Sequence, residues 1–138
     1  MTNLELVLEA KKAREHAYCP YSHHSVGAAL VTKDGKIYHG CNIEDAAYGP
    51  TNCAERTAFF KAVYEGEREF SKIAIVGGME GTDGNAPCAP CGVCRQVMME
   101  FCNPETFEIV LADGEDKQLV YKLNELLPLG FGPDNLDK

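Results

Sequence analysis

Three cysteines and one glutamate are the residues whose types and spacing suggest chemistry. Cys53 stands two residues before Glu55, and Cys91 and Cys94 follow as a Cys-x-x-Cys pair directly after Pro90. A zinc ion that only stabilises a fold usually takes four protein ligands, whereas a catalytic zinc takes three and keeps one position for water. Three cysteines beside an acid that does not bind the metal therefore predict Zn²⁺ and hydrolytic chemistry.

A fourth cysteine leaves a structural alternative open. The chain contains seven cysteines, and Cys88 forms a second Cys-x-x-Cys with Cys91. If Cys88 joined Cys53, Cys91 and Cys94, the four sulfurs would close a structural site. Pro90 argues against this, because proline favours the first turn of a helix and would place Cys91 and Cys94 on that turn. We expect Cys88 to lie in the preceding loop as a buried free thiol.

Glu55 also has a purely structural interpretation. Thr51 or Asn52 can cap a helix over residues 53–65, and Asn52-x-x-Glu55 resembles a capping box that binds the acid to the first turn. The starts of this helix and of the next cysteine-bearing helix would lower the thiol pKa values through their dipoles. Because Cys53 lies two residues away, we favour catalysis for Glu55.

The pattern of apolar residues and turn residues predicts an α/β fold. The first helix opens at Thr2-x-x-Glu5 and ends at Pro20, and its expected apolar face contains Leu4, Val7, Leu8, Ala10, Ala13 and Ala17. Asp34-Gly35 predicts a hairpin turn between two strands. Further elements alternate, which implies a sheet with helices on both faces. The expected strands are 26–32, 36–41, 73–76, 108–111 and 118–121, and the later helices are 53–65, 91–101 and 124–127.

Composition predicts one small domain that spans residues 1–138. The chain is 45% hydrophobic and carries a formal net charge of −8, which argues against a nucleic-acid partner because such proteins carry basic patches. No apolar run reaches the roughly 20 residues of a membrane-spanning helix, so we expect no membrane partner. The odd number of cysteines and the absence of an apolar N-terminal stretch predict a reducing, cytoplasmic location.

Five segments of the chain resemble the small homotetrameric cytidine deaminases. A cysteine-x-glutamate element followed by Pro-Cys-x-x-Cys is also the pattern of the zinc-dependent base deaminases. The segments occur in the family's order along nearly the whole chain. They are Pro20-Tyr21-Ser22-His23 with Val26 to Leu30, Gly40 to Gly49, Cys53 to Ala58, Pro90 to Gln96, and Glu125 to Pro128.

The resemblance implies a fold, a cofactor and a reaction. The fold is a three-layer α/β/α sandwich with a five-stranded mixed sheet, and the cofactor is one Zn²⁺ per chain, held by Cys53, Cys91 and Cys94. The reaction is hydrolysis of cytidine and 2′-deoxycytidine to the uridine nucleosides and ammonia in pyrimidine salvage, with Glu55 moving protons. Another aminopyrimidine nucleoside, such as a nucleoside antibiotic, is an alternative substrate. A non-catalytic four-cysteine zinc module is the alternative from a different class.

The resemblance also implies contacts to the nucleoside within one chain. Asn42 and Glu44 would bind ribose hydroxyls, and the backbone carbonyl of Ala54 would accept a hydrogen bond from the amino group of the base. Arg56 would draw negative charge from the cysteine sulfurs, because groups that bond to metal ligands tune the metal. A carboxylate near the sugar would favour a nucleoside over a nucleotide.

Other contacts would come from neighbouring subunits of a homotetramer. The resemblance places Ala46, Ala47 and Tyr48 from one neighbour and Phe131 from another at each site. His24 departs from the family, which usually has a phenylalanine that packs on the base. We expect the imidazole to stack in the same direction, although it is more polar and titrates near neutral pH.

Overall fold

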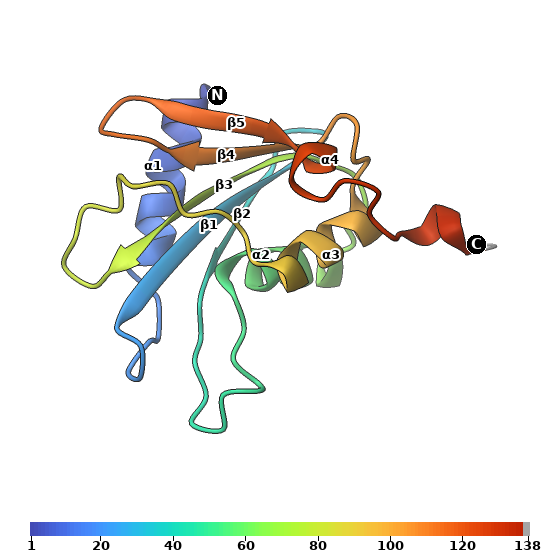
Figure 1. Ribbon diagram of the computed structural model, residues 1–138. Coiled ribbons are helices and arrows are strands. Elements are labelled where there is room, and N and C mark those ends of the chain that lie inside the picture. Colours follow the sequence, from blue (N-terminus) through green and yellow to red (C-terminus); the bar gives the residue numbers. More distant parts are fainter. Residues whose placement is uncertain (137–138) are drawn as a thin grey trace.

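A five-stranded mixed sheet forms the middle layer of the protein, in the order β2-β1-β3-β4-β5 (Figure 1). The computed structural model describes residues 1–136. Strands β3 and β4 are parallel, and the other neighbouring strands are antiparallel. The strands are β1 (His24–Thr32), β2 (Ile37–Cys41), β3 (Phe70–Met79), β4 (Glu108–Ala112) and β5 (Gln118–Lys122).

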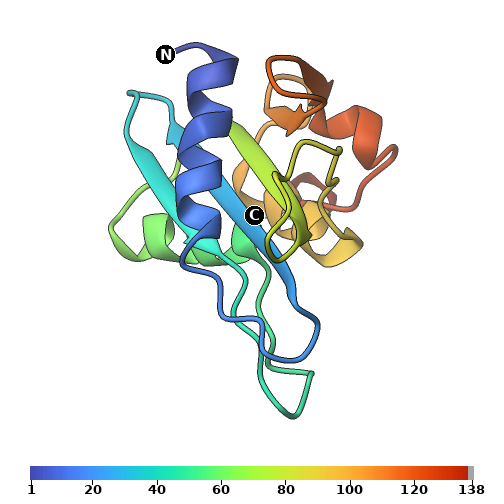
Figure 2. The same cartoon turned by 90° about the vertical axis from the view of Figure 1, so that its left-hand side faces the viewer.

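Helices cover both faces of this sheet. Figure 2 shows α1 lying across one face, and α2 and α3 lie side by side on the other. The alternation of side chains along β1 serves both layers, because Ala29 packs with α1 while Ala28 and Leu30 pack with α2 and α3. The three-layer α/β/α fold is therefore confirmed. The helices are α1 (Asn3–Arg14), α2 (Ala54–Tyr64), α3 (Gly92–Phe101), α4 (Leu123–Leu126) and the 3₁₀ helix η1 (Pro133–Asn135).

Helix α1 begins as predicted but ends earlier, and its buried face matches the predicted one only in part. Thr2 and Glu5 form the expected capping box. Val7, Ala10 and Ala13 are buried as predicted, but Leu6 is buried as well and Leu8 is exposed, so the predicted apolar face was partly wrong. The predicted end at Pro20 was also wrong.

Backbone pairing explains why α1 stops at Arg14. Tyr18 leaves the helical path because its N–H donates to Asn42 O at 2.9 Å and its carbonyl accepts from Glu44 N at 2.9 Å. The Arg14 side chain then donates to the carbonyl oxygens of Ser25, Met79 and Thr82. This arginine therefore ties the start of β1 to the turn that follows β3.

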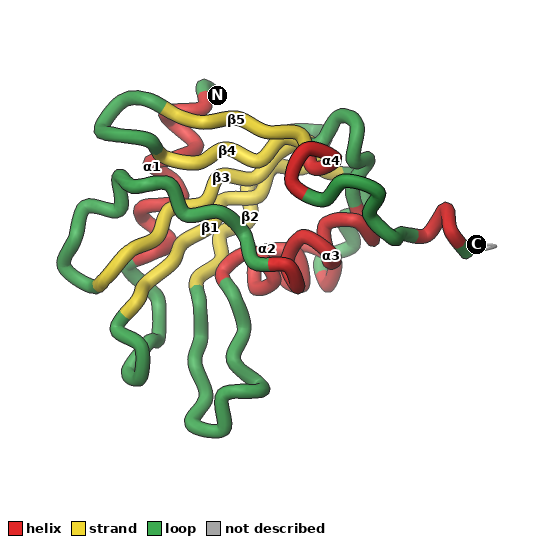
Figure 3. Tube along the Cα trace, in the orientation of Figure 1, coloured by secondary structure: helices red, strands yellow, loops and turns green. Residues whose placement is uncertain are grey.

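The hairpin between β1 and β2 forms where Asp34-Gly35 predicted it. Gly35 has a φ of +94°, a conformation that glycine adopts without steric cost. Strand β3 is longer than expected, because its continuation to Met79 pairs with β1 as far as His24. Long loops leave the sheet before α2 and before α3, and Figure 3 shows the first of them projecting well beyond the strands.

Within residues 1–136, the longest helix has 12 residues, and no helix is long and apolar enough to span a membrane.

Candidate metal centre and active site

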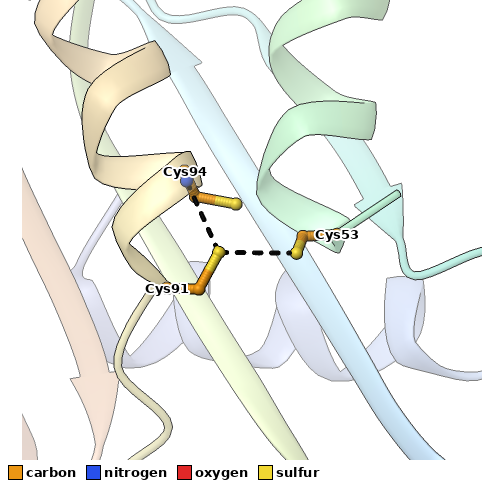
Figure 4. Close-up of side chains that lie close together, drawn as sticks. All are labelled: Cys53, Cys91 and Cys94. Atoms are coloured by element: carbon orange, nitrogen blue, oxygen red, sulfur yellow. Dashed lines mark hydrogen bonds between the residues drawn. The ribbon is translucent and has the colours of Figure 1, made fainter. Parts of the chain in front are cut away.

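Three cysteine sulfurs meet where α2 and α3 begin. The Sγ atoms of Cys53, Cys91 and Cys94 all lie within 4.8 Å of one another, and the Cys53–Cys91 separation is 3.7 Å (Figure 4). Zn–S bonds of about 2.3 Å at a tetrahedral ion require neighbouring sulfurs about 3.8 Å apart. The donor type and this spacing both fit Zn²⁺.

The first turns of two helices place these sulfurs. Cys53 is the N-cap residue of α2, and Cys91 is the N-cap residue of α3, where its Sγ accepts from Cys94 N at 3.5 Å. The predicted caps Thr51 and Asn52 and the predicted first-turn position of Pro90 were therefore wrong by one or two residues. The cysteines themselves occupy the capping positions, so both helix dipoles end at the sulfur cluster.

Cys88 stands apart from this cluster. The group of potential metal ligands found among residues 1–136 consists of three cysteines and does not include Cys88. Its sulfur packs on Gly77 instead, since a Cβ at that glycine would lie 2.6 Å from Cys88 Sγ. Burial raises the pKa of this thiol, which is half-buried and so less enclosed than expected. The four-cysteine arrangement is absent from the described residues.

Hydrogen bonds make Cys53 the anionic member of the cluster. Arg56 Nη2 donates to Cys53 Sγ at 3.3 Å. The hydrogen bond with Cys94 and the bond from Arg56 lower the pKa of Cys53 to about 5, whereas the bond with Cys53 raises the pKa of Cys94. Because zinc binds thiolates, metal binding must displace the Cys94 proton. Arg56 Nε is buried and has no hydrogen-bond partner within residues 1–136.

Glu55 points into the protein next to the cluster. The residue is 4% exposed, and burial raises the pKa of its carboxyl to about 7 in the metal-free chain. The capping-box interpretation was wrong, because Asn52 N donates to Ile43 O at 2.9 Å and its Nδ2 donates to Thr57 Oγ1 at 3.1 Å. A carboxyl with a pKa near 7 can both accept and release a proton near neutral pH.

The three cysteines of the cluster differ in solvent exposure. Cys94 is buried, Cys53 is half-buried and Cys91 is exposed. The same helix start also brings in Ala54, whose carbonyl oxygen would lie 2.3 Å from a Cβ at Gly40. Because Ala54 is the first residue of α2, its N–H group has no acceptor within the helix and points toward the cluster end of α2.

Asn42 bonds to the first residues of β1, and Glu44 bonds to the segment just before that strand. Asn42 Oδ1 accepts from Val26 N, and its Nδ2 donates to His24 O, each at 2.8 Å. Glu44 accepts from Tyr21 and Ser22, contacts that the sequence reasoning did not assign. The clue was present, since Tyr21 and Ser22 belong to a matched motif.

His24 is the first residue of β1 and is half-buried, and its main chain pairs with Met79. Ala46 and Ala47 are exposed in the projecting loop before α2, where Tyr48 is 72% exposed. Phe131 is 57% exposed beyond α4, and its carbonyl accepts from Gln96 of α3. The three loop residues and Phe131 lie on exposed surface of the single chain.

This α/β fold with a three-sulfur cluster and a buried glutamate defines a class of zinc-dependent deaminases. The family model for the cytidine and deoxycytidylate deaminase zinc-binding region matches residues 1–110. The chain therefore belongs to the cytidine and deoxycytidylate deaminase family.

Individual relatives agree along almost their whole length. A cytidine deaminase of Sporosarcina psychrophila is 51% identical over 96% of this chain and 93% of its own. One of Halalkalibacterium halodurans is 47% identical over 96% of each chain. The crystal structure of a cytidine deaminase from Burkholderia pseudomallei matches with a TM-score of 0.85 and 53% identity, covering 95% of this chain and all of that one (100%).

Proposed function

We propose that this chain is a zinc-dependent cytidine deaminase that hydrolyses cytidine and 2′-deoxycytidine to uridine, 2′-deoxyuridine and ammonia. The observation that carries the proposal is Glu55, buried to 4% exposure immediately beside a cluster of three potential zinc ligands. Burying an acid costs folding free energy, so its burial at this position supports a functional role. The relatives named cytidine deaminase support the same substrate.

The protein's own groups would supply the proton transfers. Zinc bound by Cys53, Cys91 and Cys94 would supply a Lewis acid that makes a water molecule a nucleophile near neutral pH. Glu55 would accept the proton of that water as it attacks C4 of the cytosine ring. The same carboxyl would then give that proton to N3, take the proton of the hydroxyl group now on C4 and pass it to the departing amine, which its raised pKa permits.

Arg56 would adjust the charge of the site. Three thiolates around Zn²⁺ leave a net charge of about −1, which opposes the acidification of water. The guanidinium of Arg56 already donates to Cys53 Sγ at 3.3 Å and so withdraws charge from that sulfur.

Residues at the start of β1 and after β2 would bind the nucleoside. We assign Asn42 and Glu44 to the ribose hydroxyls, Ala54 to the base through its backbone, and His24 to stacking on the pyrimidine. Asn42 supports this, because its bonds to Val26 N and His24 O leave one amide hydrogen for a ligand. Glu44 would repel a 5′-phosphate and favour free nucleosides.

Neighbouring subunits would complete the site in a homotetramer. Ala46, Ala47 and Tyr48 project from the chain in a loop, and Phe131 is exposed, which supports their contact with another subunit. We also propose that residues 1–138 form one catalytic domain, that the enzyme is cytoplasmic and that it serves pyrimidine salvage.

Purified protein tests the proposal directly. Loss of cytidine absorbance near its ultraviolet maximum should accompany release of ammonia, with about one zinc per chain. A zinc-loaded chain without turnover of cytidine or 2′-deoxycytidine would contradict it. A Cys88→Ser variant should keep both its zinc and its activity, which separates the three-cysteine site from a four-cysteine one.

A further inference from the structure

The Glu44 carboxylate is held by three hydrogen bonds from two consecutive residues. Oε1 accepts from Tyr21 N at 3.0 Å and from Ser22 N at 3.1 Å. Oε2 accepts from the hydroxyl of Ser22. These bonds favour the ionised form, and the pKa of Glu44 is lowered, chiefly by the Ser22 hydroxyl.

The Ser22 hydroxyl is itself fixed by a second bond. Its oxygen accepts from His24 N at 3.0 Å while its hydrogen is donated to Glu44. A hydroxyl carries one hydrogen, so the bond from His24 leaves that hydrogen directed at the carboxylate. Ser22 thus connects the acid to the residue that begins β1.

The bonds also limit what Glu44 can still accept. A carboxylate offers about four acceptor positions. Both positions of Oε1 are taken by main-chain N–H groups, and one position of Oε2 is taken by Ser22. One acceptor position on Oε2 therefore remains for a ligand.

Glu44 is also one of the residues that line a surface cavity. Tyr21, Ser22, Glu44, Tyr48 and Thr51 line this cavity of about 320 Å³. The rings of two of these residues, Tyr21 and Tyr48, pack edge to face with their centroids 6.2 Å apart. A small polar group of a ligand can enter there.

We propose that Ser22 is a positioning residue that orients Glu44 and restricts it to one hydroxyl group of the nucleoside. This inference rests on the proposed function, because it assumes that Glu44 faces the sugar. It predicts that Glu44 distinguishes the 2′-hydroxyl from the 3′-hydroxyl and binds one of them.

A set of variants tests the positioning role. Ser22→Ala should raise the KM for cytidine about tenfold, because a hydrogen bond to a charged group is lost. Its kcat should stay within about twofold, because the bond acts equally in ground and transition states. Ser22→Thr should restore the KM, since it keeps the hydroxyl. Ser71→Ala is the matched control, because the Ser71 hydroxyl bonds to the carbonyls of Val31 and Thr32.

The combination with Glu44→Gln and the choice of substrate sharpen the test. In the Glu44→Gln background, Ser22→Ala should change KM by less than about twofold. One of 2′-deoxycytidine and 3′-deoxycytidine should have the same KM as cytidine. The other, which lacks the hydroxyl that Glu44 binds, should have a higher KM. Additive effects of the two substitutions, or equal behaviour of both deoxynucleosides, would overturn the inference.

A measurement without turnover separates this inference from the proposed function. The amide protons of Tyr21 and Ser22 should resonate upfield in Glu44→Gln relative to the unmodified chain, because they lose a charged acceptor. Unchanged resonances would refute the positioning of Glu44. A zinc-loaded, unmodified chain that deaminates neither cytidine nor 2′-deoxycytidine would instead refute the proposed function.

Discussion

At the start of α1, Thr2 and Glu5 cap one another, whereas Asn52 and Glu55, with the same spacing at the start of α2, do not. Glu5 is exposed and bonds to Thr2 N at 2.9 Å. Glu55 is buried, and the N–H of Asn52 is taken by Ile43 O at 2.9 Å. The same short pattern thus stabilises a helix in one place and supplies an isolated acid in the other. What surrounds the turn decides between the two outcomes.

Replacing the N-cap residues of α1 and α2 should show the largest difference between the two helix starts, in zinc binding and activity. Cys53→Ala should abolish zinc binding and deamination, because two sulfurs remain for the metal. Thr2→Ala should leave zinc content and kcat unchanged and cost about 1 kcal/mol of stability. Metal analysis, cytidine turnover and denaturant unfolding measure the three quantities. Full activity in Cys53→Ala would remove the basis of the metal site.

Neutralising the two glutamates should give the next largest effect. Glu55→Gln should lower kcat by about 10²–10⁴-fold, because the amide cannot carry the proton, while zinc content stays the same. Glu5→Gln is the matched control and should leave kcat unchanged, since Glu5 lies at the start of α1 and bonds to Thr2. Steady-state kinetics on both variants decide the matter. Equal kcat values in the two would mean that Glu55 is not the proton carrier.

Arg56 in the first turn of α2 and Arg68 in the segment after that helix allow a smaller comparison. Arg56→Met should weaken zinc binding by about 10–100-fold, since it removes the cation that stabilises the Cys53 thiolate. Arg68→Met should not, because the Arg68 guanidinium bonds to the carbonyl oxygens of Val63 and Glu67. Competition with a chelator of known affinity measures both. Similar zinc affinities in the two variants would argue against a role for Arg56.

The smallest expected effect concerns pH and the α1 capping box. Hydrogen bonds from the backbone and side chain of Thr2 lower the pKa of Glu5 in the folded chain. Because the folded pKa lies below the unfolded value, Glu5 contributes stability near pH 7 and loses it as the pH falls through the folded pKa. Unfolding free energies of the unmodified chain and Glu5→Gln should therefore differ at pH 7 and converge in acid. A constant difference would contradict this.

The comparison also shows what the sequence could predict. Ligand spacing along the chain pointed to Cys53, Cys91 and Cys94 but left Cys88 open as a fourth ligand, and the structure brings only the first three together within residues 1–136. Gly35 marked the hairpin for a similarly local reason, its positive φ.

Long-range contacts explain the failures. The end of α1 depends on Tyr18 pairing with Asn42 and Glu44, residues more than twenty positions away. The hydrogen bonds between Ser22 and Glu44 were missed for the same reason, because they also join residues far apart in the sequence. The periodicity of α1 allowed neighbouring stripes, and packing on the sheet selected the one that contains Leu6 instead of Leu8.

Gly40 gives the metal centre a rigid support. A Cβ at this position would lie 2.3 Å from Ala54 O and 2.6 Å from Ala58 N, so the first turn of α2 rests directly on the main chain of β2. The cradle for the ion is thereby preorganised by packing, unlike that of a zinc finger, which folds when it captures its metal. A chelator should consequently remove the zinc without unfolding the enzyme, and added zinc should restore the activity without a refolding step.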